Sequence, residues 1–329
     1  MSYLQTKTIR GIFCICLFGL LLPSCTPSFD DQGLQSCNCA APNNRPHQQG
    51  IRALLASRFN SLEALKEVLQ IDYHYVDEQT DSAGARRSFV TLQHCSHHQK
   101  AKSLLSQGLR QKDITDAANG TFLDRVFLLL KDPYAARNRI NLYKVFNLGR
   151  RRANVYGYGD VAFYDLALAS VRHIIPQENS FLSPQDSSEK GYLNTFNHIT
   201  AQAIITACFS EEFADYIADV HERNNLPQLI TGKFPEIQGG DAAQTPVDNY
   251  VDMINNEWGQ SIGLRLKKEL NIDATTRWTP ALLCQFLNKI QQHYCYAFGI
   301  QMNPFRKNDS LILKYTAKIN KVLLEGIIN

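Results

Sequence analysis

The feature that most constrains the fold is a helical spacing of apolar residues that recurs along most of the chain. Apolar side chains three or four residues apart mark one face of an α-helix, whereas strict alternation marks a strand. This spacing predicts helices over residues 51–70, 97–111, 113–130, 134–148, 160–175, 194–209, 211–224, 246–270, 280–298 and 310–327. Only residues 71–76 and 88–93 alternate like strands, and we expect them to pair across a turn at residues 81–85. The sequence therefore predicts an all-α, multi-helix globular domain with at most one small β-hairpin.

The first 25 residues combine positive charge, an apolar run and a cysteine. Two cations precede an eleven-residue apolar run over residues 12–22, and the run leads into a Leu-Pro-Ser-Cys sequence whose cysteine is Cys25. This order resembles a bacterial lipoprotein signal peptide. The run is shorter than the roughly 20 apolar residues that a membrane-spanning helix needs, and Pro23 interrupts it. We therefore expect residues 1–24 to be a signal peptide that is removed, and Cys25 to carry the lipid.

Composition divides the rest of the chain. Residues 25–50 are rich in Pro, Gly, Asn and Gln and poor in aliphatic side chains, which is typical of a flexible tether. A Pro- and Ser-rich stretch at residues 176–191 then separates an N-terminal helical region, 51–190, from a second helical domain, 191–329. We expect the mature protein to be attached to a membrane of the cell envelope through Cys25 and to face away from the cytoplasm.

Charge and motifs exclude several classes of function. The chain has 34 basic and 31 acidic side chains, and two of the basic ones lie in the expected signal peptide, so no strong field favours nucleic acid as a partner. The sequence contains no Gly-rich phosphate loop, no Gly-x-Ser-x-Gly elbow and no His-Glu-x-x-His run. Nucleotide binding, serine hydrolase chemistry and zincin protease chemistry therefore have no motif support. No protein or envelope partner other than the membrane is indicated.

Six cysteines remain outside the signal peptide and the lipidation site, namely Cys37, Cys39, Cys95, Cys208, Cys284 and Cys295. An exported chain permits disulfides, and six cysteines allow fifteen pairings among which the sequence does not choose. Cys208 lies within an apolar helical run, so we expect it to be a small buried hydrophobic residue.

Three motifs within residues 194–263 are candidates for chemistry. They are Phe196-x-His198, Ala218-x-x-His221-Glu222 and Asp252-x-x-Asn255-Asn256-x-x-Gly259. In this order they resemble an uncharacterised helical family of bacterial exported and toxin-like proteins. That family shares an F-x-H helix, a helix closing in A-x-x-H-E and a D-x-x-N-N-x-x-G helix. The resemblance implies a helical fold and the matching polar residues, but no particular reaction. Gln202 and Ile254 stand where that family often has Asn and His.

The spacing of the motifs predicts that the two histidines meet. Ser210, followed by two glutamates, is a typical helix N-cap, so the helices before and after it should fold back as a hairpin. His198 lies twelve residues before Ser210 and His221 eleven after it. At a rise of ~1.5 Å per residue, both stand on the order of 17 Å from the turn. His221 also shares an i+3 and i+4 stripe with Ala214 and Ile217, so we expect it to point inward.

The third motif adds a polar face on a separate helix, since its residues lie three or four apart. Two imidazoles, a carboxylate and this polar face suit either a metal site or an acid/base pair. We predict catalytic or metal-ligating roles for His198, His221 and Asp252, and ligand-binding roles for Glu222, Asn255 and Asn256. The sequence does not identify a cofactor, and a divalent metal is the candidate if the site binds one.

Two function classes stay open. The chain is a lipoprotein hydrolase that acts through these residues, or it is a non-catalytic binding or scaffold lipoprotein. In the second case, the same side chains satisfy each other's hydrogen bonds and fix the register of the helices.

Overall fold

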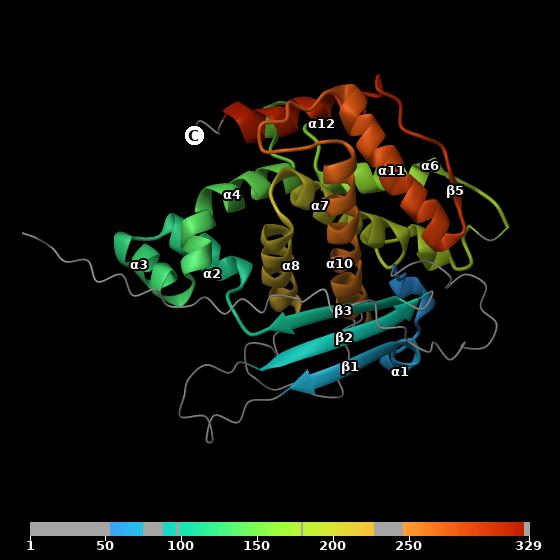
Figure 1. The fold of residues 1–329 in the computed structure, drawn as a ribbon, viewed down its shortest axis with the longest axis horizontal. Helices are drawn as coiled ribbons and strands as arrows, with labels where there is room; N and C mark the ends of the chain where they lie inside the picture. The colour runs from blue at the N-terminus through green and yellow to red at the C-terminus, as the bar shows by residue number, and fades with distance from the viewer. Residues whose placement is uncertain (1–52, 75–87, 97–98, 179, 227–245, 326–329) are drawn as a thin grey trace, which may run out of the picture. The chain divides into compact units, whose positions relative to one another are not determined.

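The computed structural model describes residues 53–74, 88–96, 99–178, 180–226 and 246–325 (Figure 1). The chain divides into two units, residues 1–35 and residues 36–329, and every described residue belongs to the second unit. The expected signal peptide, Cys25 and the whole of the expected tether lie outside the described residues. Within the described ranges, no helix combines the length and the apolar character needed to cross a bilayer.

Helices predominate among the described elements, which confirms the predicted all-α class (Figure 1). They are α1 (Leu62–Lys66), α2 (Gln111–Asn119), α3 (Phe122–Lys131), α4 (Pro133–Gly149), α5 (Ala153–Tyr156), α6 (Phe163–His173), α7 (Tyr192–Cys208), α8 (Glu211–Asn225), α10 (Pro246–Glu269), α11 (Pro280–Phe298) and α12 (Ser310–Asn320). Three short turns of helix complete the set, η1 (Ala56–Arg58), η2 (Pro184–Ser187) and η3 (Lys321–Glu325). The predicted helices from residue 134 onward correspond to α4, α6, α7, α8, α10, α11 and α12, with shifted ends.

The sheet is larger than the predicted hairpin. Strands β1 (Leu69–His74), β2 (Phe89–Ser96) and β3 (Gln99–Ser106) form an antiparallel sheet in that order. Pairing of β1 with β2 confirms the hairpin, whose predicted turn lies outside the described residues. The third strand contradicts the predicted helix over residues 97–111. Ala101, Ser103 and Leu105 are buried while the residues between them are more exposed, so this segment follows the two-residue period of a strand. A second, two-stranded sheet pairs β4 (Ile174–Ile175) with β5 (Gln301–Met302).

The predicted helix over residues 51–70 is also wrong. Residues 53–56 alternate between two cores, with Ala53 and Leu55 in one and Leu54 and Ala56 in the other. Side chains of an extended segment point alternately to opposite sides, so this segment serves both cores. Helix α1 begins only after Ser61, whose side chain accepts a hydrogen bond from the backbone of Ala64.

The predicted helix over residues 113–130 is interrupted at Gly120 and Thr121. The backbone N–H of Thr121 donates to Asp124 Oδ2 at 2.6 Å, and Thr121 Oγ1 accepts from the backbone N–H of Asp124 at 3.4 Å. This reciprocal pair is a capping box, which starts α3 as a separate helix.

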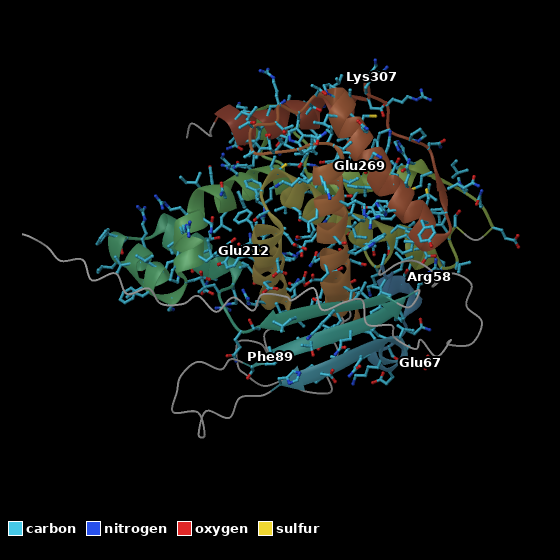
Figure 2. The ribbon with its side chains drawn as sticks, viewed as in Figure 1. Arg58, Glu67, Phe89, Glu212, Glu269 and Lys307 are labelled. Atoms are coloured by element: carbon cyan, nitrogen blue, oxygen red, sulfur yellow. The ribbon has the colours of Figure 1, made fainter. Side chains whose placement is uncertain are left out.

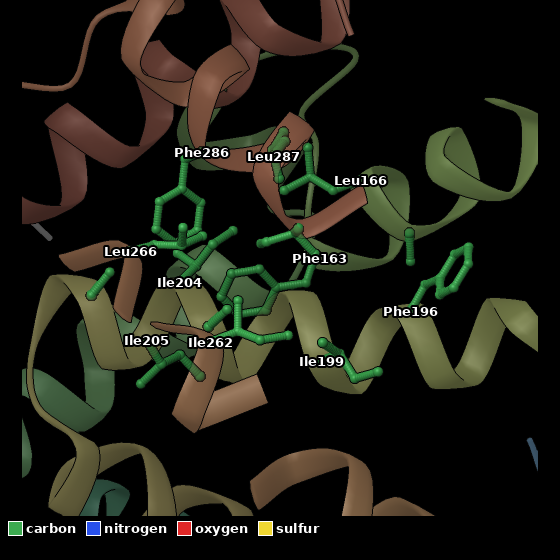
Figure 3. Packing of buried hydrophobic residues seen from close by; sticks show 14 of the residues in the cluster. Phe163, Leu166, Phe196, Ile199, Ile204, Ile205, Ile262, Leu266, Phe286 and Leu287 are labelled. Carbon is green, nitrogen blue, oxygen red and sulfur yellow. The ribbon is translucent and has the colours of Figure 1, made fainter. Parts of the chain in front are cut away.

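Two hydrophobic cores meet along α10. The larger core surrounds α7, of whose 17 residues 13 are buried, and it includes Phe196 and Ile199 (Figure 3). It also includes Leu166 of α6, so residues on both sides of the predicted boundary at 190/191 share it. The smaller core lies between the three-stranded sheet and the first half of α10. Trp258, farther along α10, belongs to the larger core, so this one helix connects both.

The segment that leads into the fold is held by polar contacts. Arg58, which lies near the sheet (Figure 2), forms an ion pair with Asp186 at 3.0 Å. Ser57 Oγ donates to the same carboxylate at 2.7 Å, and Asp186 is fully buried. Because a buried carboxylate needs a cation or hydrogen-bond donors, this contact fixes residues 57–58 against η2.

Cys208, Cys284 and Cys295 are free thiols. Cys208 is buried in the larger core, which confirms the expectation that it behaves as a small hydrophobic residue. Burial also raises the pKa of its thiol to about 12, so the group stays neutral.

Helices α7 and α10 approach closely because two glycines of α10 face α7. A Cβ atom on Gly259 would lie 2.7 Å from the carbonyl oxygen of Ile199, and one on Gly263 would lie 2.6 Å from that of Ala203. These distances are below contact distance, so only glycine permits this separation of the two backbones.

We predict that Gly263→Ala lowers the free energy of unfolding by about 1–3 kcal/mol, because the added methyl group forces α7 and α10 apart. Urea unfolding measures the change. Ser261→Ala, a half-buried position on the same helix, is the control and should change stability by less than about 0.5 kcal/mol. Equal stability of Gly263→Ala and the wild type would contradict the close contact.

Candidate functional site

The candidate site lies between α7, α8 and α10, each of which turns one polar stripe toward the others. The stripes follow the i+3 and i+4 spacing of one helix face. They comprise Asn194, His198 and Gln202 on α7, Asp215, Asp219 and Glu222 on α8, and Asp252, Asn256 and Gln260 on α10. Ser210 Oγ accepts from the backbone N–H of Phe213 at 3.1 Å, so α8 begins where the sequence predicted. The three helices thereby bring residues of all three motifs together.

His198 is the centre of the network. Its Nδ1 lies 2.9 Å from Asn256 Oδ1, and its Nε2 lies 3.2 Å from Asp252 Oδ2. Asn194 Nδ2 donates to both oxygens of Asp252, at 2.9 and 3.1 Å. Because Asn256 Oδ1 is an acceptor, the arrangement favours the tautomer with the proton on Nδ1. The structure therefore brings His198 and Asp252, which the sequence assigned to one candidate site, to hydrogen-bonding distance.

Glu222 completes the network from α8. Its Oε1 accepts from Asn256 Nδ2 at 3.0 Å and lies 3.9 Å from His198 Nδ1. The residue is 1% exposed, and its Oε2 has no hydrogen-bond partner among the described residues. A buried oxygen without a partner is costly, so this atom is available to a proton or a cation.

His221 differs from its predicted orientation. The sequence predicted that its side chain points inward, but His221 is exposed and its neighbour Glu222 is buried. The inward face of α8 is the stripe of Asp215, Asp219 and Glu222, and adjacent helical residues point about 100° apart. His221 nevertheless lies beside His198, with the ring centroids 5.9 Å apart. The predicted meeting of the two histidines is therefore confirmed.

One nitrogen of His198, one nitrogen of His221 and one oxygen of Glu222 all lie within 4.8 Å of one another. Imidazole nitrogen and carboxylate oxygen are the ligand types that zinc and similar ions take. His198 is largely buried, Glu222 is buried and His221 reaches solvent, so the group lies at the edge of the three-helix interior.

Asn255 belongs to a different set of contacts. Its Oδ1 accepts from the backbone N–H of Leu54, and its Nδ2 donates to the carbonyl oxygen of Leu54, both at 3.0 Å. Thr195 Oγ1 donates to the same carbonyl at 3.1 Å. Asn255 was predicted to bind a ligand, but its amide holds the N-terminal segment, and Asn256 is the member of the pair that contacts His198.

Sequence reasoning missed several acidic neighbours. A narrow cavity beside the network is lined by Ser103, Asp215, Ala218, Asp219, Glu222, Met253, Asn256 and Glu257. Arg223 forms an ion pair with Asp219 at 3.0 Å. Asn194 and Asp248 were missed as well, and Asn194 Nδ2 lies 3.3 Å from Asp248 Oδ1. The i, i+4 spacing of Asp215 with Asp219, and of Asn194 with His198, was the available signal.

Burial controls protonation in this region. It raises the pKa of Asp252 to about 8, and burial together with neighbouring carboxylates raises the pKa of Glu257 to about 8 and that of Asp248 to about 6. Burial, followed by the charge of Asp252, also raises the pKa of Glu222 well above its ordinary value. Burial lowers the pKa of His198. Desolvation by the surrounding protein lowers the pKa of His221, although the residue is exposed, and the charges of His198 and Arg150 add to this effect.

Comparison of the chain with protein-family models, with curated proteins and with solved structures finds no match. The resemblance to the uncharacterised helical family therefore stays a prediction.

We predict that, in buffer containing a chelator, the melting temperature falls as the pH rises from about 6.5 to 8.5. Over this range, folded Asp252 and Glu257 hold protons that the unfolded chain has lost, because their pKa values are raised to about 8 from 3.8 and 4.5. Stability therefore decreases with rising pH. The histidines, whose pKa values are lowered, oppose this trend only below about pH 6.5. Thermal unfolding followed by circular dichroism measures the slope.

The double variant Asp252→Asn with Glu257→Gln is the comparison for this prediction. Neither replacement side chain titrates, so the variant should show a clearly shallower slope over the same pH range. A wild-type melting temperature that is constant from pH 6.5 to 8.5 would contradict the proposed protonation.

Proposed function

We propose that this protein is a lipid-anchored hydrolase of the bacterial cell envelope that binds one divalent transition-metal ion through His198, His221 and Glu222. The observation that carries the proposal is the convergence of three ligand atoms within 4.8 Å of one another. They include a buried carboxylate, one of whose oxygens has no hydrogen-bond partner in the described part of the chain. Zinc ligands lie about 2 Å from the ion, so small side-chain rotations would bring all three atoms into coordination.

The surroundings of the three residues suit a catalytic rather than a closed site. Structural zinc sites use four protein ligands, whereas catalytic sites use three and leave a position for water or substrate. Three candidate ligands are present, and His221 reaches solvent. A metal bound there would polarise a substrate and activate water for hydrolysis.

Asp252 and Asn256 act as positioning residues in this proposal. They hold opposite nitrogens of His198, at 3.2 and 2.9 Å. Whichever nitrogen binds the ion, the other keeps a hydrogen-bond partner that fixes the ring, an arrangement common around metal-bound histidines. Asn256 also holds Glu222, and Asn194 holds Asp252, so each predicted ligand within the helix interior is oriented by a neighbour.

The non-catalytic alternative is also supported by a specific observation. One continuous network of polar contacts connects the three helices, and it runs through Asn194, Asp252, His198, Asn256 and Glu222. Such a network can fix helix register without any ligand. A scaffold lipoprotein would need the interior residues of this network but not His221, whose side chain is exposed.

The purified protein is expected to take up one zinc, cobalt or manganese ion per chain and to melt at a higher temperature with the ion than with a chelator. A free metal ion at 100 times the Kd of its site adds about 2.7 kcal/mol to the free energy of unfolding. His221→Ala should leave the melting temperature in chelator unchanged, since the side chain is exposed, but should abolish the gain from metal. Elemental analysis and thermal unfolding are the measurements.

His293→Ala is the matched control, because His293 is a histidine of α11 outside the three-ligand group. This variant should bind metal like the wild type. Equal metal stabilisation of His221→Ala and the wild type, or no uptake of metal at all, would refute the metal site and leave the scaffold role.

The anchor is tested separately. Cys25→Ala should accumulate as a larger precursor and lose labelling by a clickable fatty acid, because the cleavage and acylation signal requires that cysteine. Cys295→Ala is the control and should process and label normally. Unchanged labelling of Cys25→Ala would show that the protein is not a lipoprotein.

A further inference from the structure

Helix α3 exposes an unusually apolar surface. None of its residues is buried. Phe122 is 77% exposed, Leu123 62%, Phe127 58% and Leu130 73%. Monomeric proteins rarely leave such a group of large apolar side chains in water unless it binds something. This surface is separate from the candidate metal site.

The apolar residues of α3 share one face. Leu123, Phe127 and Leu130 have the i, i+4, i+7 spacing of a single helical stripe. Helix α3 packs against α2 and α4. Ile140 of α4 is a further large apolar residue of this region, and it is 63% exposed. An amphipathic helix of this kind is long enough to lie in a membrane interface but not to span the bilayer.

Exposed cations accompany this apolar face. Residues 122–149, which comprise α3 and α4, contain five basic and two acidic side chains, a net charge of +3. The whole chain also has a net charge of +3, so the remainder is balanced. Arg125, Lys131, Arg137 and Arg139 are among the exposed cations of this segment. Anionic lipid headgroups attract clustered cations beside an apolar helix.

We infer that α3, with the exposed cations around it, docks on an anionic lipid bilayer and inserts Leu123, Phe127 and Leu130 among the headgroups. This inference rests on the proposed lipid anchor, which would hold the chain at a bilayer, and that bilayer is the surface that α3 would meet.

Vesicle binding tests this inference on the chain from Thr26 onward, which lacks the acylated cysteine and contains the whole compact unit of residues 36–329. The protein should float with vesicles that contain about 30% phosphatidylglycerol, and should bind at least tenfold more weakly to phosphatidylcholine alone or in 0.5 M salt. Phe127→Asp with Leu130→Asp should reduce binding to the anionic vesicles at least tenfold. Both positions are exposed, so the fold should persist, as circular dichroism verifies.

Tyr296→Asp with Leu313→Asp is the matched control, because these side chains are exposed apolar residues of α11 and α12. It should bind vesicles like the unmodified chain. Absence of vesicle binding, or equal binding by the α3 variant, would overturn the inference. So would a dimer in light scattering that the α3 variant abolishes, since a second copy would then cover the face. Chelator is present throughout, so the result is independent of the proposed metal site.

Discussion

The close contact between α7 and α10 determines how the site residues of these two helices meet. Gly259 and Gly263 allow the α10 backbone to reach the carbonyls of Ile199 and Ala203. Asn256 precedes Gly259 by three residues and His198 directly precedes Ile199. The tight crossing therefore sets the 2.9 Å contact between His198 and Asn256. A larger separation would remove that hydrogen bond and leave two polar groups without partners in the interior, at a cost of about 1–3 kcal/mol each.

The interior formed in this way contains more carboxylates than positive charges can balance. Arg223 contacts Asp219, and burial lowers the pKa of His198, so that this ring favours the neutral form. Buried carboxylates are stable only when they are protonated, paired or bound to a metal. At low pH the first solution suffices, and at higher pH a divalent ion would replace the missing protons. The proposed metal site and the expected loss of stability with rising pH therefore have one cause.

The sequence predicted the site better than it predicted the N-terminal part of the fold. Ser210 is a strong N-cap that separates two long helices. Regular helical geometry then places His198 and His221 at similar distances from the turn, and their ring centroids lie 5.9 Å apart. Strand β3 and residues 53–56 were mistaken for helix because their structure depends on distant partners. Leu54, for instance, is held by Asn255, 201 residues away. The side from which α7 and α10 approach α8 decides whether His221 or Glu222 is buried, and no local pattern contains that information.

The third motif shows why its residues have different roles although they are close in sequence. On a helix, residues four apart share a face, and neighbouring residues point about 100° apart. Asp252 and Asn256 form one such pair, and both contact His198. Asn255 and Gly259 form the second pair. Asn255 holds the backbone of Leu54, and Gly259 packs against α7. The spacing D-x-x-N-N-x-x-G therefore combines a pair that faces the candidate site with a pair that positions the helix and the segment leading from the proposed anchor. Replacing Asn255 would disturb the fold, whereas replacing Asn256 would disturb the ligands directly.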